Sequence, residues 1–224
     1  MYLRIAHRGA PHLAPENSLK SFEASLAFSP DMVEMDVRVS RDGHVVVMHD
    51  QTVDRMTTGR GKVILKTLAQ LRACRFGNGE HIPTMAEAVD LLKGKAELKV
   101  DVKDVGIEDL VVGELRRAGV VRCTIVIAYG RKALAAFKDL CPSLRTEVGG
   151  VFSGRNRDPA IADALQTGAT VLSTRYKIVT PDFVKECRAN GLAIHAWTVN
   201  DRKAAARMTD LGVDAVATDR LDIV

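Results

Sequence analysis

The chain has 224 residues, 46% of them hydrophobic and 27% charged, and a formal net charge of +4 at pH 7. This composition is typical of a globular protein that can bury a full core. The absence of a Lys/Arg run or of a basic stripe interleaved with aromatic residues argues against a nucleic-acid partner. No apolar run of about 18 residues predicts a membrane-spanning helix, and the apolar stretch at the N-terminus is too short for a signal peptide. We therefore expect a cytoplasmic protein without stable membrane insertion.

Short apolar runs rich in Val and Ile alternate along the chain with segments of helical periodicity. The expected strands, in chain order, are Leu3–Ala6, Met32–Val37, Val45–His49, Leu98–Lys103, Thr124–Ala128, Leu144–Val148, Thr170–Ser173, Ala193–Val199 and Ala215–Thr218. The expected helices are Asn17–Ala27, Thr84–Leu92, Ile107–Ala118, Lys132–Leu140, Asp158–Gln166, Pro181–Asn190 and Arg202–Asp210.

Several helix boundaries carry chemical signals. Thr84 is followed three residues later by Glu87, which is the pattern of a capping box. Thr180 precedes a proline, which suits an N-cap with proline at the first helical position. Gly119 and Gly212 each follow a helical pattern, as glycines that end helices do.

Repeated βα units predict a parallel sheet with helices outside it, either an open doubly wound sheet or a closed (β/α)8 TIM-type barrel. The length favours the barrel, which typically takes about 250 residues, and no Gly-x-Gly-x-x-Gly motif supports the open sheet. Nine strands compete for eight places. Because only a tight turn at Asp42-Gly43 separates two of them, we expect an antiparallel hairpin near residues 36–48. We expect a single domain, residues 1–224, in which Asp50–Ile82 is an excursion above the barrel mouth.

Polar side chains gather at the ends of the expected strands, where barrel enzymes carry their catalytic groups. Glu34 and Asp36 are two residues apart on one strand, so both point to the same side. Two neighbouring carboxylates raise each other's pKa unless a cation lies between them. Oxygen ligands suit a hard divalent cation, which predicts Mg2+ or Ca2+ here.

From Glu97 to Lys103, charged and apolar residues alternate along the fourth expected strand. Asp101 and Lys103 are nearest its end and best placed to reach the barrel mouth. Asp101 is a candidate third metal ligand, and Lys103 a candidate for holding a phosphate oxygen. Glu97 lies on the same face, deeper in the strand.

Two histidines end neighbouring strands beside this acidic group. His7 and His49 suit general acid and base roles, because their unperturbed pKa lies near neutrality. Arg8 has the planar fork that binds phosphate with two hydrogen bonds, but strand alternation points it away from the His7 side. A bend at Gly9 is needed to bring Arg8 into the site.

A series of short motifs runs in a fixed order through nearly the whole chain. In order they are Ala6-His7-Arg8-Gly9, Ala14-Pro15-Glu16-Asn17-Ser18, Val33-Glu34-Met35-Asp36-Val37, Ser40-Arg41-Asp42-Gly43, His49-Asp50, Arg55-Met56-Thr57, Ile82-Pro83-Thr84-Met85, Trp197-Thr198-Val199-Asn200 and Thr218-Asp219. Each motif is weak alone, but this order and spacing resembles the glycerophosphodiester phosphodiesterase family.

The resemblance implies a TIM-type barrel that hydrolyses glycerophosphodiesters to glycerol 3-phosphate and an alcohol, with a divalent metal for which Mn2+ is an alternative to Mg2+ and Ca2+. The substrate is then a small molecule. By role, the implied residues are the metal ligands Glu34, Asp36 and Asp101, the catalytic His7 and His49, and the substrate-binding Arg8, Lys103 and Trp197.

The third metal ligand departs from the family pattern. The family usually has Glu two residues before the strand lysine, whereas this chain has Asp101, one methylene shorter. Glu97 precedes Lys99 with the same spacing and is the competing candidate. We favour Asp101, because its distance along the chain from Thr84 fits the family better.

Two other functions stay open at this point. One is a related lipid phosphodiesterase of the lysophospholipase D type, although no strongly apolar membrane-binding helix is evident. The other is a barrel that binds phosphodiesters without catalysis, against which the two histidines argue.

Overall fold

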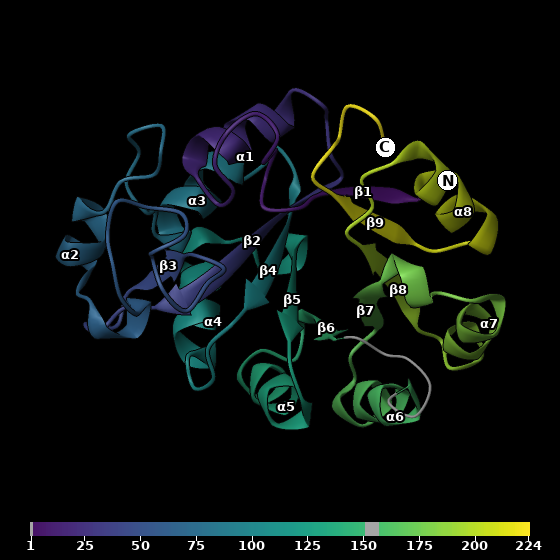
Figure 1. Ribbon diagram of the computed structural model, residues 1–224. Coiled ribbons are helices and arrows are strands. Elements are labelled where there is room, and N and C mark those ends of the chain that lie inside the picture. The colour runs from purple at the N-terminus through teal and green to yellow at the C-terminus, as the bar shows by residue number, and fades with distance from the viewer. Residues whose placement is uncertain (1, 151–156) are drawn as a thin grey trace.

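Eight parallel strands close into a barrel in the computed structural model, which describes residues 2–150 and 157–224. Strand β1 pairs with both β2 and β9, so the sheet has no open edge between them (Figure 1). The barrel strands are β1 (Leu3–Ala6), β2 (Met32–Val39), β4 (Glu97–Val102), β5 (Thr124–Ala128), β6 (Arg145–Gly149), β7 (Val171–Arg175), β8 (Ala193–Trp197) and β9 (Ala215–Thr218). This closure confirms the predicted (β/α)8 barrel and excludes the open sheet.

Helices surround the barrel and cover the outer faces of its strands (Figure 1). They are α1 (Leu19–Leu26), α3 (Met85–Leu92), α4 (Glu108–Ala118), α5 (Arg131–Leu140), α6 (Arg157–Thr167), α7 (Pro181–Ala189) and α8 (Arg202–Leu211), with short 3-10 turns at Val121–Cys123 and Tyr176–Ile178. The predicted capping signals are present: Thr84 and Glu87 form a capping box, and Thr180 caps a helix with proline at its start. Gly119 and Gly212 end α4 and α8 in the left-handed conformation.

The barrel interior changes character along its axis. Towards the amino ends of the strands it is filled by a small apolar cluster that includes Ile5, Met32 and Ile125. Two and four residues further along β2 the inward positions are the buried acids Glu34 and Asp36. Because alternate residues of a strand face the interior, the apolar floor and the polar mouth are built by the same strands.

The predicted hairpin is present beside the barrel. Strand β3 (Val45–Val47) pairs antiparallel with the end of β2, with Val37 opposite Val47 and Val39 opposite Val45. The turn carries Gly43 at a φ of 81°, a conformation that favours glycine. Strand β3 is therefore the surplus strand, and it extends the sheet outside the closed barrel.

The segment between β3 and α3 contains structure that periodicity did not predict. It holds a 3-10 turn at Val63–Leu65 and helix α2 (Leu68–Ala73), which begins at a capping box formed by Thr67 and Gln70. A helix of six residues is too short to show a periodic pattern. The segment packs an apolar cluster of its own onto Val46 and Met48 and, in Figure 1, lies to the side of the barrel rather than over its centre.

Within residues 2–150 and 157–224, no helix combines the length and the apolar character needed to cross a bilayer. The cytoplasmic location stays a prediction.

Candidate active site

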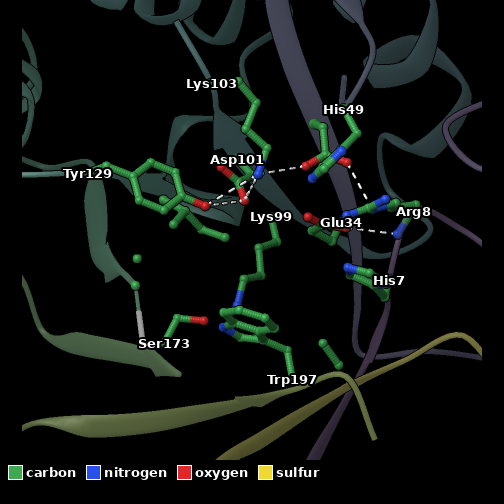
Figure 2. A pocket seen from close by; sticks show the side chains of 15 residues that line it. His7, Arg8, Glu34, His49, Lys99, Asp101, Lys103, Tyr129, Ser173 and Trp197 are labelled. Carbon is green, nitrogen blue, oxygen red and sulfur yellow. Dashed lines mark hydrogen bonds and ion pairs between the residues drawn. The ribbon is translucent and has the colours of Figure 1, made fainter. Parts of the chain in front are cut away.

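A pocket of about 230 Å3 opens at the carboxyl ends of the barrel strands (Figure 2). It is lined by all eight residues that the sequence analysis named as site residues. These eight are His7, Arg8, Glu34, Asp36, His49, Asp101, Lys103 and Trp197. Three further polar residues, Lys99, Tyr129 and Ser173, also line the pocket. The structure thus brings together residues of β2, β4 and β8 and residues in the segments that follow β1, β3 and β4.

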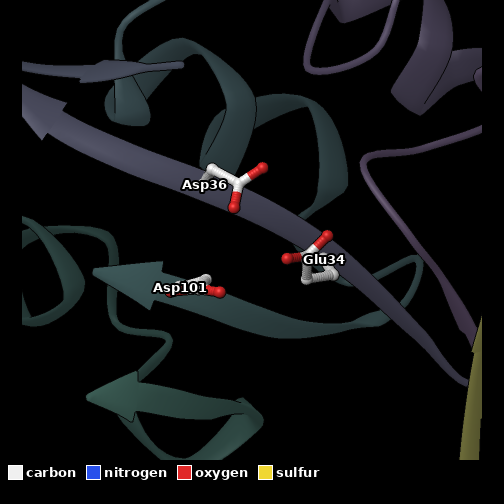
Figure 3. Close-up of side chains that lie close together, drawn as sticks. All are labelled: Glu34, Asp36 and Asp101. Carbon is white, nitrogen blue, oxygen red and sulfur yellow. The ribbon is translucent and has the colours of Figure 1, made fainter. Parts of the chain in front are cut away.

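Three carboxylates converge on one side of the pocket (Figure 3). Oxygen atoms of Glu34, Asp36 and Asp101 lie within 4.8 Å of one another, and all three side chains are buried. Asp101 lies directly opposite Asp36 across the pairing of β4 with β2. Glu97 lies at the start of β4 and pairs with Arg145 at 2.7 Å instead, so it is not part of this group.

The group of three carboxylates lies next to a half-buried cation, and the mutual repulsion of the three would be reduced by further positive charge. Lys103 Nζ lies 3.0 Å from Asp36 Oδ1 and 2.6 Å from Asp101 Oδ2. Burial and the neighbouring Asp36 raise the pKa of Glu34 to about 7. Burial also raises the pKa of Asp101, whereas Lys103 and Arg8 outweigh burial at Asp36 and lower its pKa.

A divalent cation fits this group of residues. Asp101 Oδ1 is buried without a hydrogen-bond partner, so one ligand oxygen is already desolvated and uncommitted. Three carboxylates in such proximity supply the oxygen donors that hard cations prefer. Asn17 holds Asp36 in place: its side-chain amide donates to Asp36 Oδ2 at 2.8 Å.

Arg8 enters the pocket because the chain bends where β1 ends. Its backbone is left-handed, with φ of 57°, and Gly9 follows at φ of 86°. Its backbone N–H donates to Glu34 Oε2 at 2.8 Å, and its guanidinium Nε lies 3.1 Å from Asp36 Oδ2. Strand alternation alone would have pointed Arg8 away, so the bend at Arg8 and Gly9 is what positions it.

Each of the two histidines is paired with a carboxylate through the same ring nitrogen. His7 Nδ1 lies 2.7 Å from Asp219 Oδ1, and His49 Nδ1 lies 2.7 Å from Asp50 Oδ1. Such pairing fixes the ring and leaves Nε2 for proton transfer. Burial lowers the pKa of His7, but the Glu34 and Asp219 carboxylates outweigh it and the net shift is upward.

Further charged residues tie the pocket wall together. Arg55 donates to Asp50 at 2.6 Å and to Glu16 at 2.7 Å, and Arg8 donates to the same Glu16 oxygen at 2.9 Å. Asp50 therefore links His49, through Arg55 and Glu16, to Arg8. His49 is thus held in position by Asp50 and Arg55, which follow it in the chain.

A second group of charges lies deeper in the barrel. Glu147 is fully buried and pairs with Lys99 at 2.8 Å and with His195 at 2.7 Å. Lys99 also lines the pocket (Figure 2). Burial opposes ionisation of Glu147, but Lys99 and His195 outweigh it and lower its pKa to about 2.

Sequence reasoning assigned no role to several of these residues. Asp50, Asp219, Arg55 and Glu16 all stand inside recognised motifs, so their position beside the histidines and Arg8 was the available signal. Tyr129, whose hydroxyl donates to Asp101 at 2.8 Å, stands outside every motif and lies in the pocket directly after β5.

Comparison with known proteins gives one consistent result. The model of the glycerophosphoryl diester phosphodiesterase family matches residues 7–223. A glycerophosphodiester phosphodiesterase of Caldanaerobacter subterraneus subsp. tengcongensis is 32% identical, covering 97% of this chain and 93% of the relative.

Solved structures give the same picture. An Oleispira antarctica phosphodiesterase, solved in complex with the product sn-glycerol-3-phosphate, superposes with a TM-score of 0.88 at 26% identity, covering 97% of this chain and 92% of its own. A glycerophosphodiester phosphodiesterase from Parabacteroides distasonis superposes with a TM-score of 0.86 at 27% identity, covering 99% and 94%. With the family model spanning nearly the whole chain, this protein belongs to the glycerophosphoryl diester phosphodiesterase family.

Proposed function

We propose that residues 1–224, acting as one domain, hydrolyse glycerophosphodiesters to sn-glycerol 3-phosphate and an alcohol, with a bound divalent cation. The observation that carries this proposal is the meeting of three carboxylates and two carboxylate-paired histidines in one pocket of a family member. The Oleispira relative with sn-glycerol-3-phosphate bound supports the same product.

Glu34, Asp36 and Asp101 would hold the cation, with Mg2+, Ca2+ and Mn2+ as the candidates. When bound, the cation supplies Lewis-acid stabilisation of charge on the phosphate. The neighbouring Lys103 and Arg8 contribute two further positive groups. Both already lie within about 3 Å of Asp36, so they are placed to offset charge that develops on the phosphate oxygens.

The two histidines divide the proton transfers. One removes a proton from the attacking oxygen, which is either water or a glycerol hydroxyl of the substrate, and the other protonates the leaving alkoxide. Asp219 and Asp50 hold the two rings so that each presents its Nε2. Trp197 forms one side of the pocket and gives the substrate an apolar surface (Figure 2).

Activity assays on the purified protein test this proposal. The substrates are glycerophosphoglycerol, glycerophosphoethanolamine and a lysophospholipid, each with EDTA and with added Mg2+, Mn2+ or Ca2+. We expect release of sn-glycerol 3-phosphate that EDTA abolishes and a divalent cation restores. Full activity in EDTA would refute the metal requirement. Hydrolysis of the lysophospholipid alone would point to the lipid phosphodiesterase, and tight binding without turnover to a non-catalytic barrel.

A further inference from the structure

A second hollow adjoins the catalytic pocket on its β7–β8 side. Trp197 lines both, so the two spaces are neighbours across one indole ring. The second hollow is also lined by Arg175, Lys177 and Asp201. It therefore offers space, next to the catalytic pocket, for a part of a substrate that extends past Trp197.

Both cationic side chains of this hollow are exposed, and each lies over an aromatic ring: Arg175 over Trp197, and Lys177 with its Nζ 5.9 Å from the centre of the Tyr176 ring. Arg175 ends β7 directly opposite Trp197, and its guanidinium carbon lies 5.7 Å from the centre of the indole ring. Within the described part of the chain, neither Arg175 nor Lys177 forms an ion pair with a carboxylate. The nearby Asp201 carboxylate accepts the Ala204 N–H at 2.8 Å, as the N-cap of α8.

The aromatic rings of the pocket are already engaged by cations. Lys103 Nζ lies 5.4 Å from the centre of the Tyr129 ring, and the Arg175 guanidinium makes a similar cation-π contact with the Trp197 ring. A quaternary ammonium group is bound by uncovered aromatic faces. A choline head group would have to displace a cation of the protein and would then face its charge.

We propose that the hollow beside Trp197 binds a negatively charged group on the alcohol half of the substrate, through Arg175 assisted by Lys177. This inference rests on the proposed function and names the class of head group. A carboxylate or a phosphate has the planar or tetrahedral oxygens that a guanidinium binds with two hydrogen bonds. Substrates whose leaving alcohol is anionic are preferred over those whose leaving alcohol carries an ammonium group.

A matched pair of substrates tests the proposal. The phosphodiester of glycerol with glycerate differs from glycerophosphoglycerol only by a carboxylate in place of a hydroxymethyl group. We expect kcat/KM for the glycerate diester to exceed that for glycerophosphoglycerol about three- to tenfold at low ionic strength, and glycerophosphocholine to be the poorest of the three. The preference should fall as salt is added, because both cations are exposed.

Variants assign the preference to this hollow. Arg175→Gln should bring the ratio of kcat/KM for the glycerate diester to that for glycerophosphoglycerol close to one, whatever its effect on both substrates alike, and Lys177→Gln should lower this ratio less. Arg175→Lys, which keeps the charge, should retain part of the preference. The control is Arg122→Gln, an exposed residue before β5 at the opposite end of the barrel, which makes the same change in net charge.

The possible results distinguish failure of the anionic subsite from failure of the proposed phosphodiesterase activity. If glycerophosphoglycerol is hydrolysed but the glycerate diester has no advantage, or keeps its advantage in Arg175→Gln, the anionic subsite is refuted and the proposed function stands. If none of the three diesters is hydrolysed under any metal condition, both proposals fail.

Discussion

Asp101 on β4 lies directly opposite Asp36 on β2, and both carboxylates contact the ammonium group of Lys103. Two buried acids in register would repel each other without a positive group between them. Lys103 supplies part of that charge, and Asp101 Oδ1 still has no hydrogen-bond partner. The register of two neighbouring strands thus places the Asp36 and Asp101 carboxylates side by side, where they could hold a further cation.

Replacing Asp101 should therefore weaken cation binding. We expect Asp101→Asn to raise the cation concentration that gives half-maximal activity by at least about tenfold, because removing even groups that only orient metal ligands has effects of that size. Glu97→Gln is the matched control, since Glu97 shares the strand face but pairs with Arg145. Titration of activity and calorimetry with Mg2+ measure both. A larger effect of Glu97→Gln would assign the third ligand to that residue instead.

Removing either histidine should slow the chemical step. His7→Ala and His49→Ala are each expected to lower kcat about 100-fold or more, the contribution of a general acid or base. His44→Ala is the control, because His44 is exposed at the hairpin turn outside the pocket. Steady-state kinetics and a thermal melt on each variant are the measurements. A variant with wild-type kcat would show that its histidine transfers no proton.

The carboxylate behind His7 should act on both rate and pH dependence. Asp219→Asn is expected to lower kcat about ten- to 100-fold, the range seen when a group orienting a metal-binding histidine is removed. Asp219 also raises the pKa of His7, so its loss should move the His7 limb of the kcat/KM profile to lower pH. Asp222→Asn, an exposed neighbour paired with Arg220, is the control. An unshifted profile would mean that the pairing is only structural.

The glycine after Arg8 should tolerate no side chain. A Cβ built on Gly9 would lie 2.5 Å from Ser21 Oγ and 2.6 Å from a Ser21 backbone atom, whereas one on Gly43 meets nothing within 4 Å. Both glycines have positive φ, so Gly43→Ala measures the conformational strain alone, about 1–2 kcal/mol. Gly9→Ala should lower the free energy of unfolding by clearly more and also reduce activity, because Arg8 is displaced. Equal losses in urea unfolding would show that the contact with Ser21 relaxes freely.

Sequence patterns predicted the repeated units of this fold well and the contacts between distant units poorly. The βα alternation and the turn at Asp42-Gly43 are local, so the barrel and its hairpin followed from them. The pairing of His7 with Asp219 joins the two ends of the chain and exists only because β1 closes the barrel against β9. No periodicity reports such a contact.

Arg8 shows how local geometry overrides a correct general rule. Alternation of strand side chains points Arg8 away from the His7 side. The backbone is already left-handed at Arg8, one residue before the bend that was expected at Gly9, and the alternation does not continue through it. Tyr129 shows the opposite difficulty. It follows β5, the strand that pairs with β4, and reaches Asp101 from there, but no motif or periodicity distinguishes this aromatic residue in the sequence.

The buried charges beneath the pocket should set the acid stability of the barrel. Removing one partner of a buried ion pair is strongly destabilising, so Glu147→Gln is expected to lower the free energy of unfolding by about 3–5 kcal/mol at pH 7. The pKa of Glu147 is lowered to about 2 in the folded state, below its unfolded value of about 4.3. The stabilisation is therefore fully present above that unfolded value and is lost as the pH falls towards 2.

The difference in unfolding free energy between wild type and Glu147→Gln should consequently shrink as the pH is lowered from 5 to 3. His195, whose pKa burial lowers, adds acid sensitivity to wild type and variant alike, because the unfolded chain takes up a proton that the buried ring resists. Glu97→Gln serves as the control, since its pair with Arg145 is half exposed and contributes little. Urea unfolding at pH 7, 5, 4 and 3 gives the four differences. A gap between wild type and Glu147→Gln that stays constant across this range would show that Glu147 is not ionised in the folded barrel.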